Sequence, residues 1–242
     1  MFFYPLAYFC RMEDVLGQAV YDYHKGLRES KLWIYNKYGP REEMPKDVYF
    51  REEGNMPDLE WLAIERCNGK VLDIGAGAGS HALILQQRGI DVTALDISPL
   101  LVSVMDSRTV EKVVHANIFE YNTGGFDTLL LLMNGIGLAG TIEKLKTLLL
   151  HLKTLLKPNG QILFDSSDVE YLYKDHPPSG HYYGEIAYQY AYKKVRSEWF
   201  NWLYVDEYTM TSLASECGFD MEVLLEDEFG QYLARLTPIK TL

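Results

Sequence analysis

The sequence has few cysteines. The three that occur, Cys10, Cys67 and Cys217, are odd in number and lie far apart in a chain of 242 residues. No CxxC pair or Cys/His cluster is present, so the spacing gives no sign of a zinc site. Free thiols in a reducing cytoplasm are the simplest interpretation, and we predict a cytoplasmic protein without a bound metal.

Positive charge is also scarce. The chain has 23 lysines and arginines against 34 aspartates and glutamates, which gives a formal net charge of -11. Binding to a nucleic-acid backbone relies on clustered cations, so this balance argues against nucleic acid as a partner. We expect a small-molecule substrate instead, bound by a monomer or a homodimer.

A long hydrophobic run is the third absence. The N-terminal stretch MFFYPLAYFCRMEDVL is apolar at first, but Pro5 interrupts it and it is far shorter than the roughly 20 residues of a membrane-spanning helix. We predict no membrane span. Met12 looks like a natural start, so we expect residues 1–11 to be dispensable. A hydrophobic fraction of 48% is that of a globular protein, and the length suffices for one domain with a cap.

The pattern of residues 1–66 predicts a helical cap. Apolar residues at helical spacing indicate one or two helices over residues 12–38, and Gly39–Pro40 ends them. Residues 41–57 are rich in proline and are expected to form a loop or an extended segment. Residues 58–67 predict a further helix, with Asp58 as its N-cap.

From Lys70 onward, strands and helices alternate. Short apolar runs predict buried strands at KVLDIG, DVTALD, KVVHAN, FDTLLLLM and QILFDSS, with helices over residues 81–88, 99–108 and 141–156. Such alternation predicts a parallel sheet with helices on both faces. The C-terminal third differs, because GEIAYQYAYKK and SEWFNWLYV alternate apolar and polar residues and indicate an inserted antiparallel hairpin at about 184–204. A helix over residues 208–217 and the strands MEVLLED and GQYLARL follow.

Three glycines, Gly75, Gly77 and Gly79, come directly after the first strand. They allow a sharp turn and let a ligand lie against the backbone, and the loop opens a helix whose N-terminal amides attract negative charge. Asp96 ends the next strand at the same sheet edge, where its carboxylate suits the two hydroxyls of a ribose. A dinucleotide fingerprint has GxGxxG, but the third glycine of that pattern is replaced by Ser80 here.

The pattern DxGxGxG, with Asp73 two residues before the first glycine, resembles that of the class I S-adenosylmethionine-dependent methyltransferases. The resemblance covers residues 67–236 and includes VTALDIS, HANIFEY, FDTLLLLMNGIG, LLKPNGQILFDSS and the final helix, strand, turn and strand. It implies a doubly wound α/β fold with a mostly parallel seven-stranded sheet and a reversed last strand, over residues 67–242. The donor-binding residues that it implies are Asp73, Gly75, Ala76, Gly77, Gly79, Asp96, Ile97, Asn117, Ile118, Met133 and Arg51.

Several of these roles are specific. Asp96 would bind the ribose hydroxyls, Ile97 would lie on the adenine, and Ile118 would offer a backbone amide to it. Asn117 stands where the family usually has an aspartate, so its side-chain role departs from the pattern. The runs YFR, GAGAGxHA and LLLMNGIGLAGT further resemble a small bacterial group of unassigned substrate, in which Arg51 either pairs with the donor carboxylate or only packs the cap.

Two residues are candidates for the chemistry. Methyl transfer is an in-line displacement at carbon, and a base is needed only when the acceptor arrives protonated. Asn134 ends the fourth strand and would orient the acceptor, or it only shapes a turn. Asp165 ends the fifth strand and is the candidate base, whereas Asp168 is expected to cap the next helix.

The predicted function is therefore S-adenosylmethionine-dependent methyl transfer to a small molecule. A dinucleotide-dependent oxidoreductase is the first alternative, and the glycine spacing and the final hairpin argue against it. The second alternative is a module that binds the donor without catalysis, which the intact glycine loop and Asp96 disfavour.

Overall fold

The computed structural model describes residues 14–173 and 178–240, so the segment 1–11 that we expect to be dispensable lies outside the described residues. Seven strands form the main sheet, in the order β11-β12-β7-β6-β3-β4-β5. All neighbouring pairs from β5 to β7 are parallel, whereas β12 runs antiparallel to β7 and β11. The strands are β3 Lys70–Ile74, β4 Asp91–Asp96, β5 Val113–His115, β6 Phe126–Leu131, β7 Leu156–Ser167, β11 Phe219–Glu226 and β12 Gln231–Pro238. The predicted sheet with its reversed last strand is confirmed.

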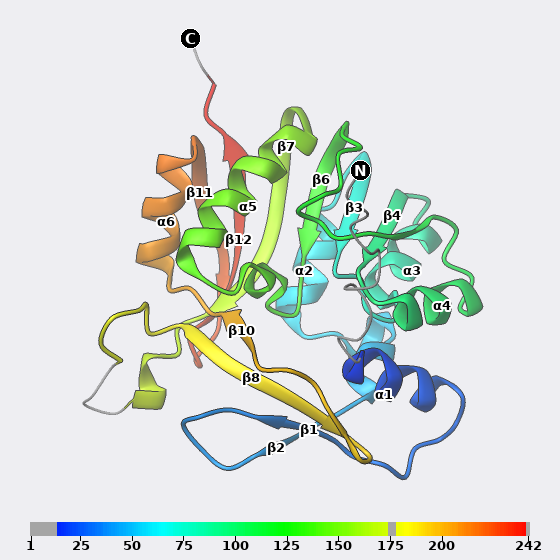
Figure 1. Cartoon of the computed structure of the whole chain (residues 1–242). Coiled ribbons are helices and arrows are strands. Elements are labelled where there is room, and N and C mark those ends of the chain that lie inside the picture. Colours follow the sequence, from blue (N-terminus) through cyan, green and yellow to red (C-terminus); the bar gives the residue numbers. More distant parts are fainter. Residues whose placement is uncertain (1–13, 174–177, 241–242) are drawn as a thin grey trace, which may run out of the picture.

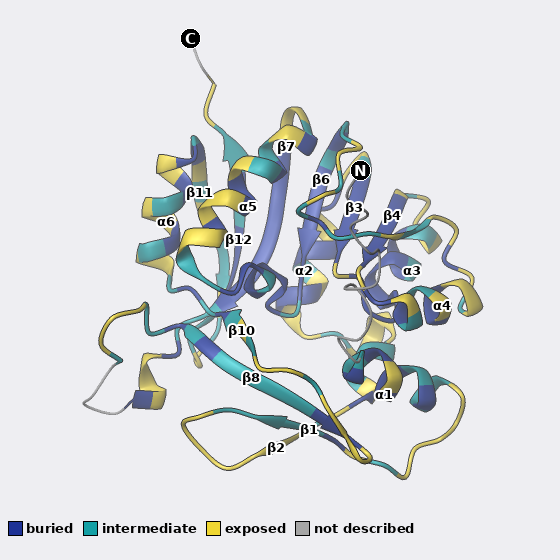
Figure 2. Ribbon diagram, in the orientation of Figure 1, coloured by how far each residue is buried: buried dark blue, intermediate teal, exposed yellow. Residues whose placement is uncertain are grey.

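Helices cover both faces of this sheet (Figure 1). The helices α2 Asp58–Arg66, α3 Ser80–Gln87 and α4 Pro99–Ser107 pack on one face, where their apolar residues form a core with Val71 and Leu130. The helices α5 Ile142–Leu155 and α6 Glu207–Glu216 pack on the other, against Leu72 and Leu129. Figure 2 shows the central strands β3, β4 and β6 as mostly buried. The doubly wound arrangement follows from strands that are apolar on both sides.

The first residues of α4 and α2 show which helix starts local sequence patterns specify. Ser98 caps α4, since its hydroxyl accepts a hydrogen bond from the Leu101 amide at 3.0 Å. Asp58 was expected to cap α2, but it is the first helical residue and Pro57 occupies the cap position. Proline leaves the preceding chain extended, which makes it a natural boundary, and Asp58 contributes a negative charge to the first turn instead.

A second, antiparallel sheet joins the N-terminal segment to the hairpin. Its order is β10-β8-β1-β2, with β9 beside β8, and the predicted hairpin of β8 and β10 is confirmed. The strands are β1 Leu32–Tyr35, β2 Glu42–Met44, β8 Glu185–Tyr192, β9 Val195–Arg196 and β10 Phe200–Leu203. Ile34 pairs with Tyr190 and Tyr35 with Gln189, so Ile34 and Tyr190 share one face of the sheet and Tyr35 lies on the other.

The prediction of helix throughout residues 12–38 is wrong in its second half. The helix α1 Val15–His24 ends just before Gly26, whose φ of +84° is typical of a residue beyond a helix end. The following LWIY forms β1, in which Leu32 is buried and the other three residues are half-buried. Its partner β8 lies about 150 residues away by sequence number, so no local signal specifies this pairing.

The second sheet lies below the carboxyl edge of the main sheet in Figure 1. Two glycines let it approach: a Cβ on Gly137, in the turn η3 Gly135–Ala139, would overlap the indole of Trp202, and one on Gly140 would lie 3.0 Å from the Asn201 carbonyl oxygen. The hairpin is thereby docked on the loop that follows β6. Within the described part of the chain, no helix is long and apolar enough to cross a membrane.

Candidate donor and acceptor site

The glycine loop is held against the neighbouring strand. The amides of Gly75 and Ala76 both donate to the Leu95 carbonyl, at 2.9 and 3.0 Å, which fixes the loop between β3 and α3. Gly75, Gly77 and Gly79 have φ values of +70°, +59° and +79°, a region that side-chain-bearing residues rarely adopt. All three predicted glycines are therefore required by the backbone.

The surroundings of the three glycines differ. A Cβ on Gly79 would lie 2.9 Å from side-chain carbons of both Met105 and Val110, so this glycine permits the packing of α3 on α4. A Cβ on Gly77 would lie 3.3 Å from the Tyr49 ring. At Gly75 nothing comes within 4 Å of such an atom, so this position faces open space where a ligand can approach.

Asp96 ends β4 beside this loop. Its two carboxylate oxygens accept hydrogen bonds from the backbone amides of Gly77 and Ser98, each at 2.9 Å. The residue is 6% exposed, and burial raises the pKa of its carboxyl to about 6, against the two amides that favour the charged form. Ile97 follows with 65% of its surface exposed, which suits a residue that lies against a flat ring.

Asp73 ends β3 and carries an unsatisfied polar atom. It is 2% exposed, and its Oδ2 is buried without a hydrogen-bond partner. Burial raises the pKa of this carboxyl to about 6, although the nearby His81 lowers it. A buried carboxylate oxygen without a partner is costly, so this atom favours a ligand or water with a donor group beside the glycine loop.

A chain of ionic contacts continues from His81. Its Nε2 lies 2.9 Å from the Glu60 carboxylate, whose other oxygen pairs with Arg51. Burial opposes the ionised form of Glu60, but the contacts to His81 and Arg51 outweigh it and lower the pKa of that carboxyl. Arg51 is thus held in place by Glu60, a residue that sequence analysis missed. The signal was available, because Glu60 shares the buried face of α2 with Leu59 and Ile64.

Asn134 and Asp165 meet at the ends of β6 and β7. Met133 and Asn134 have φ values of +58° and +55°, and the Asn134 amide donates to both Asp165 oxygens, at 3.0 and 2.9 Å. Gln231 donates to the same carboxylate at 2.9 Å and was also missed. Burial raises the pKa of Asp165 to about 6, and both its oxygens are already engaged.

One of the two polar atoms of the Asn134 side chain has no hydrogen-bond partner in the protein. Its Nδ2 donates to the Leu203 carbonyl at 3.1 Å, which fixes the orientation of the amide. Its Oδ1 is buried and has no hydrogen-bond partner in the protein, and the residue is 8% exposed. An acceptor oxygen in this state is suited to a donor group on a ligand.

Asn117 and Ile118 follow β5 at the same edge. The Asn117 side-chain oxygen accepts a hydrogen bond from the Phe119 amide at 3.1 Å, so it holds its own turn. Ile118 is 5% exposed and belongs to the core on the α5 side, which leaves its backbone as the part that a ligand can reach.

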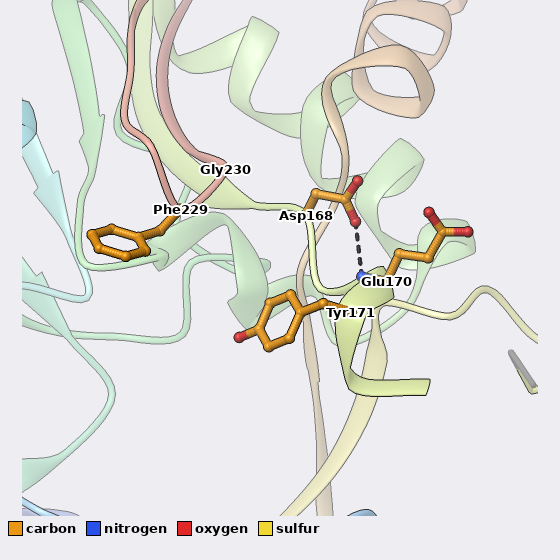
Figure 3. A pocket seen from close by; sticks show the side chains of 5 residues that line it. All are labelled: Asp168, Glu170, Tyr171, Phe229 and Gly230. Atoms are coloured by element: carbon orange, nitrogen blue, oxygen red, sulfur yellow. Dashed lines mark hydrogen bonds between the residues drawn. The ribbon is translucent and has the colours of Figure 1, made fainter. Parts of the chain in front are cut away.

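A hollow of about 540 Å³ lies at the end of β7, and Figure 3 shows its lining, in which Gly230 precedes the Asp165 partner Gln231. Asp168 accepts a hydrogen bond from the Glu170 amide at 2.9 Å, at the start of the turn η4 Glu170–Tyr173, which confirms its predicted capping role. The Asp168 backbone amide donates to the Gly230 carbonyl at 3.1 Å.

The described residues contain no group of side chains able to hold a metal ion.

These elements define a class of protein. The glycine loop, Asp96 and the ends of β5 and β6 gather at the carboxyl edge of the sheet, the position at which doubly wound folds bind nucleotide-like ligands. The reversed β12 distinguishes this sheet from that of dinucleotide-binding proteins and matches the class I methyltransferases that the sequence resembles.

Comparisons with known proteins agree. A family model described as a methyltransferase domain matches residues 49–223. An S-adenosylmethionine-dependent methyltransferase from Bacteroides fragilis, solved with S-adenosyl-L-homocysteine, is 40% identical, with a TM-score of 0.89 over 95% of this chain and 96% of that one. The chain belongs to this methyltransferase family.

More distant structures share the fold. The CcbJ methyltransferase from Streptomyces caelestis is 12% identical, with a TM-score of 0.64 over 80% of this chain and 96% of its own. The sugar N-methyltransferase KedS8 from Streptoalloteichus is 17% identical, with a TM-score of 0.57 over 85% and 97%. A search of curated protein sequences gave no significant match. The predictions of the family, of methyl transfer and of S-adenosylmethionine as donor are confirmed.

Proposed function

We propose that this methyltransferase acts on a small molecule bound between the carboxyl edge of the main sheet and the second sheet. Residues 14–66 and the hairpin would form a cap over the core of residues 67–242. The observation that carries the proposal is the enclosure of Asn134, whose backbone amide binds Asp165 on the main sheet and whose side chain binds the Leu203 carbonyl on the second sheet. A site closed in this way suits a small acceptor better than a polymer, as does the charge of -11.

The residues around the glycine loop fit the donor. The open space at Gly75 and the unpartnered Oδ2 of Asp73 are features that a bound donor would use. Asp96 would accept hydrogen bonds from the ribose, and Ile97 would lie against the adenine. The donor supplies a methyl group already activated by a positive sulfur, so the protein needs to align and desolvate the reactants.

The other predicted donor residues take supporting roles in this proposal. Arg51, fixed by Glu60, would bind the donor carboxylate as a charge-assisted pair. Ala76, Gly77 and Gly79 shape the loop, and Met133 continues it on the neighbouring strand. The adenine would be contacted by the side-chain NH2 group of Asn117 and by the Ile118 backbone. The Asn117 side-chain oxygen is not available, because it already accepts a hydrogen bond within its own turn.

Asn134 and Asp165 have different roles. We assign Asn134 as the residue that orients the acceptor, through its unpartnered Oδ1. Asp165 binds the Asn134 amide and Gln231, so it acts as a positioning residue in place of the base considered from the sequence.

The test is methyl transfer from isotopically labelled S-adenosylmethionine to separate pools of small metabolites, nucleic acids and proteins. Label in the small-molecule pool, lost in Asn134→Ala, supports the proposal. Label only in a nucleic-acid or protein pool contradicts it. Titration with NAD(P)H in parallel tests the oxidoreductase alternative, and donor binding without turnover on any pool would favour the non-catalytic one.

A further inference from the structure

The hollow at the end of β7 is lined by exposed aromatic rings and carboxylates. Tyr171 and Phe229 are 72% and 78% exposed, although large aromatic side chains usually bury most of their surface. They line it together with Asp168, Glu170 and Gly230 (Figure 3). Gly230 of this lining precedes Gln231, which donates to the Asp165 carboxylate, so the hollow opens close to the site proposed for the acceptor.

A wall of three tyrosine side chains, Tyr188, Tyr190 and Tyr204, extends from the hollow toward the second sheet. The ring centroids of Tyr188 and Tyr204 are 6.4 Å apart and their hydroxyl oxygens 3.4 Å apart. Tyr190 shares a sheet face with Tyr188, since the two are separated by one residue on β8. Val169, which lies between the lining residues Asp168 and Glu170, packs in one apolar cluster with Tyr188 and Tyr204, so this cluster links the hollow to the wall.

Among the described residues, the charged groups named along this path share one sign. Asp168 and Glu170 line the hollow, and Asp165 binds Gln231, the neighbour of Gly230 in the lining. The cation proposed for the donor side, Arg51, is already paired with Glu60. Aromatic faces and carboxylates attract cations, whereas a phenolate or carboxylate acceptor would be repelled here.

We propose that the methyl acceptor is an amine, which enters through the hollow and is held by Tyr171, Phe229 and Tyr204. This inference rests on the proposed function and names its substrate class. The Asn134 Oδ1 would accept a hydrogen bond from an N–H of that amine. In the transfer, the bound ammonium first loses a proton to water, and the freed nitrogen lone pair then forms the new N–C bond as the sulfur–methyl bond breaks with its electron pair left on sulfur.

Three matched probes test the charge preference. Benzylamine, benzyl alcohol and benzoate have one ring and differ in charge, and their binding to the protein saturated with S-adenosylhomocysteine is measured by ligand-observed NMR. We expect benzylamine to bind about tenfold more tightly than either other probe. Tyr204→Leu and Tyr171→Leu should remove this preference, and Tyr204→Phe should retain it because the ring remains.

Tyr35→Leu is the matched control, because Tyr35 lies on the opposite face of the second sheet. Equal binding of the three probes, no binding of any of them, or an equal loss in Tyr35→Leu would overturn the inference. A separate titration with S-adenosylhomocysteine keeps the two proposals apart: if the donor product binds but benzylamine has no advantage, the amine assignment alone fails. If the donor product does not bind, the proposed function itself is contradicted.

Discussion

The backbone amide of Asn134 donates to both oxygens of Asp165, at 3.0 and 2.9 Å. This contact joins the loop after β6 to the end of β7 and holds Asn134 in a left-handed conformation with φ of +55°. Asp165 therefore fixes the backbone of Asn134, and this backbone sets the direction of the Asn134 side chain. The geometry of the proposed acceptor site thus depends on Asp165, although both Asp165 oxygens bind protein groups and do not reach the acceptor.

Asp165→Ala should slow methyl transfer by about a hundredfold, because a misplaced orienting group costs about that much in rate. The affinity for S-adenosylhomocysteine should change little, since Asp73, the glycine loop and Asp96 lie at the ends of β3 and β4 and do not contact Asp165 through a hydrogen bond. The rate with the acceptor found in the pool screen and calorimetric titration of the donor product measure the two effects. Asp220→Ala, at an exposed position of β11, is the control. A loss of donor affinity as large as the loss of rate would contradict the positioning role.

Glu60→Gln should lower the free energy of unfolding by about 3 kcal/mol, because it leaves Arg51 and His81 buried with one partner removed. Glu53→Gln removes one of the two carboxylate partners of Arg88 near the surface and should cost less than about 1 kcal/mol. Urea denaturation measures both variants. Equal losses of unfolding free energy in the two variants would contradict the larger contribution expected from the contacts of Glu60 with Arg51 and His81.

Gly75→Ala should weaken donor binding more than it destabilises the fold. The left-handed backbone adds about 1–2 kcal/mol of strain, but the new methyl group meets no protein atom within 4 Å and would occupy space proposed for the donor. Gly89→Ala is closely matched, with φ of +75° and no neighbour within 4 Å, at the far end of α3. It should show the same loss of stability without the loss of affinity. The same loss of affinity in both variants would place the donor elsewhere.

Asp96 should give stability and donor binding opposite pH dependences. Burial raises its pKa from about 3.8 to about 6, so the folded protein keeps this proton to higher pH than the unfolded chain does. Folding stability from this group is therefore present at low pH and is lost as pH rises through 6. Relative to Asp96→Asn, the wild type should gain about 1 kcal/mol between pH 7 and pH 5 in urea denaturation.

The affinity for the donor should fall as the pH falls from 7 to 5, because protonation of Asp96 removes an acceptor for the ribose hydroxyls. Calorimetric titration of the wild type with S-adenosylhomocysteine at pH 5, 6 and 7 measures this. If affinity were constant from pH 7 to pH 5, the Asp96 carboxylate would not bind the donor in its charged form.

The sequence was sufficient for the core because its signals are local. Strands apolar on both faces, a glycine loop with three left-handed positions and Ser98 before Pro99 specify their own conformations. The second sheet is different, since β1 pairs with β8 far along the chain and only tertiary contact distinguishes its LWIY from a helix. Gln231 was missed for a related reason, because it acts through Asp165 on another strand, to which its position in the sequence gives no pointer. Glu60 is different, since a carboxylate on the apolar face of α2 was visible in the sequence.

The most direct test of the account is calorimetric titration of the wild type, Asp96→Ala and Asp91→Ala with S-adenosylhomocysteine. Asp91 lies at the other end of β4, where it pairs with Lys112 at the surface. We predict that the wild type and Asp91→Ala bind alike and that Asp96→Ala binds more weakly by about 1.5–3 kcal/mol, the value of hydrogen bonds to a charged group. Equal binding by all three proteins, or none by the wild type, would contradict the donor site described above.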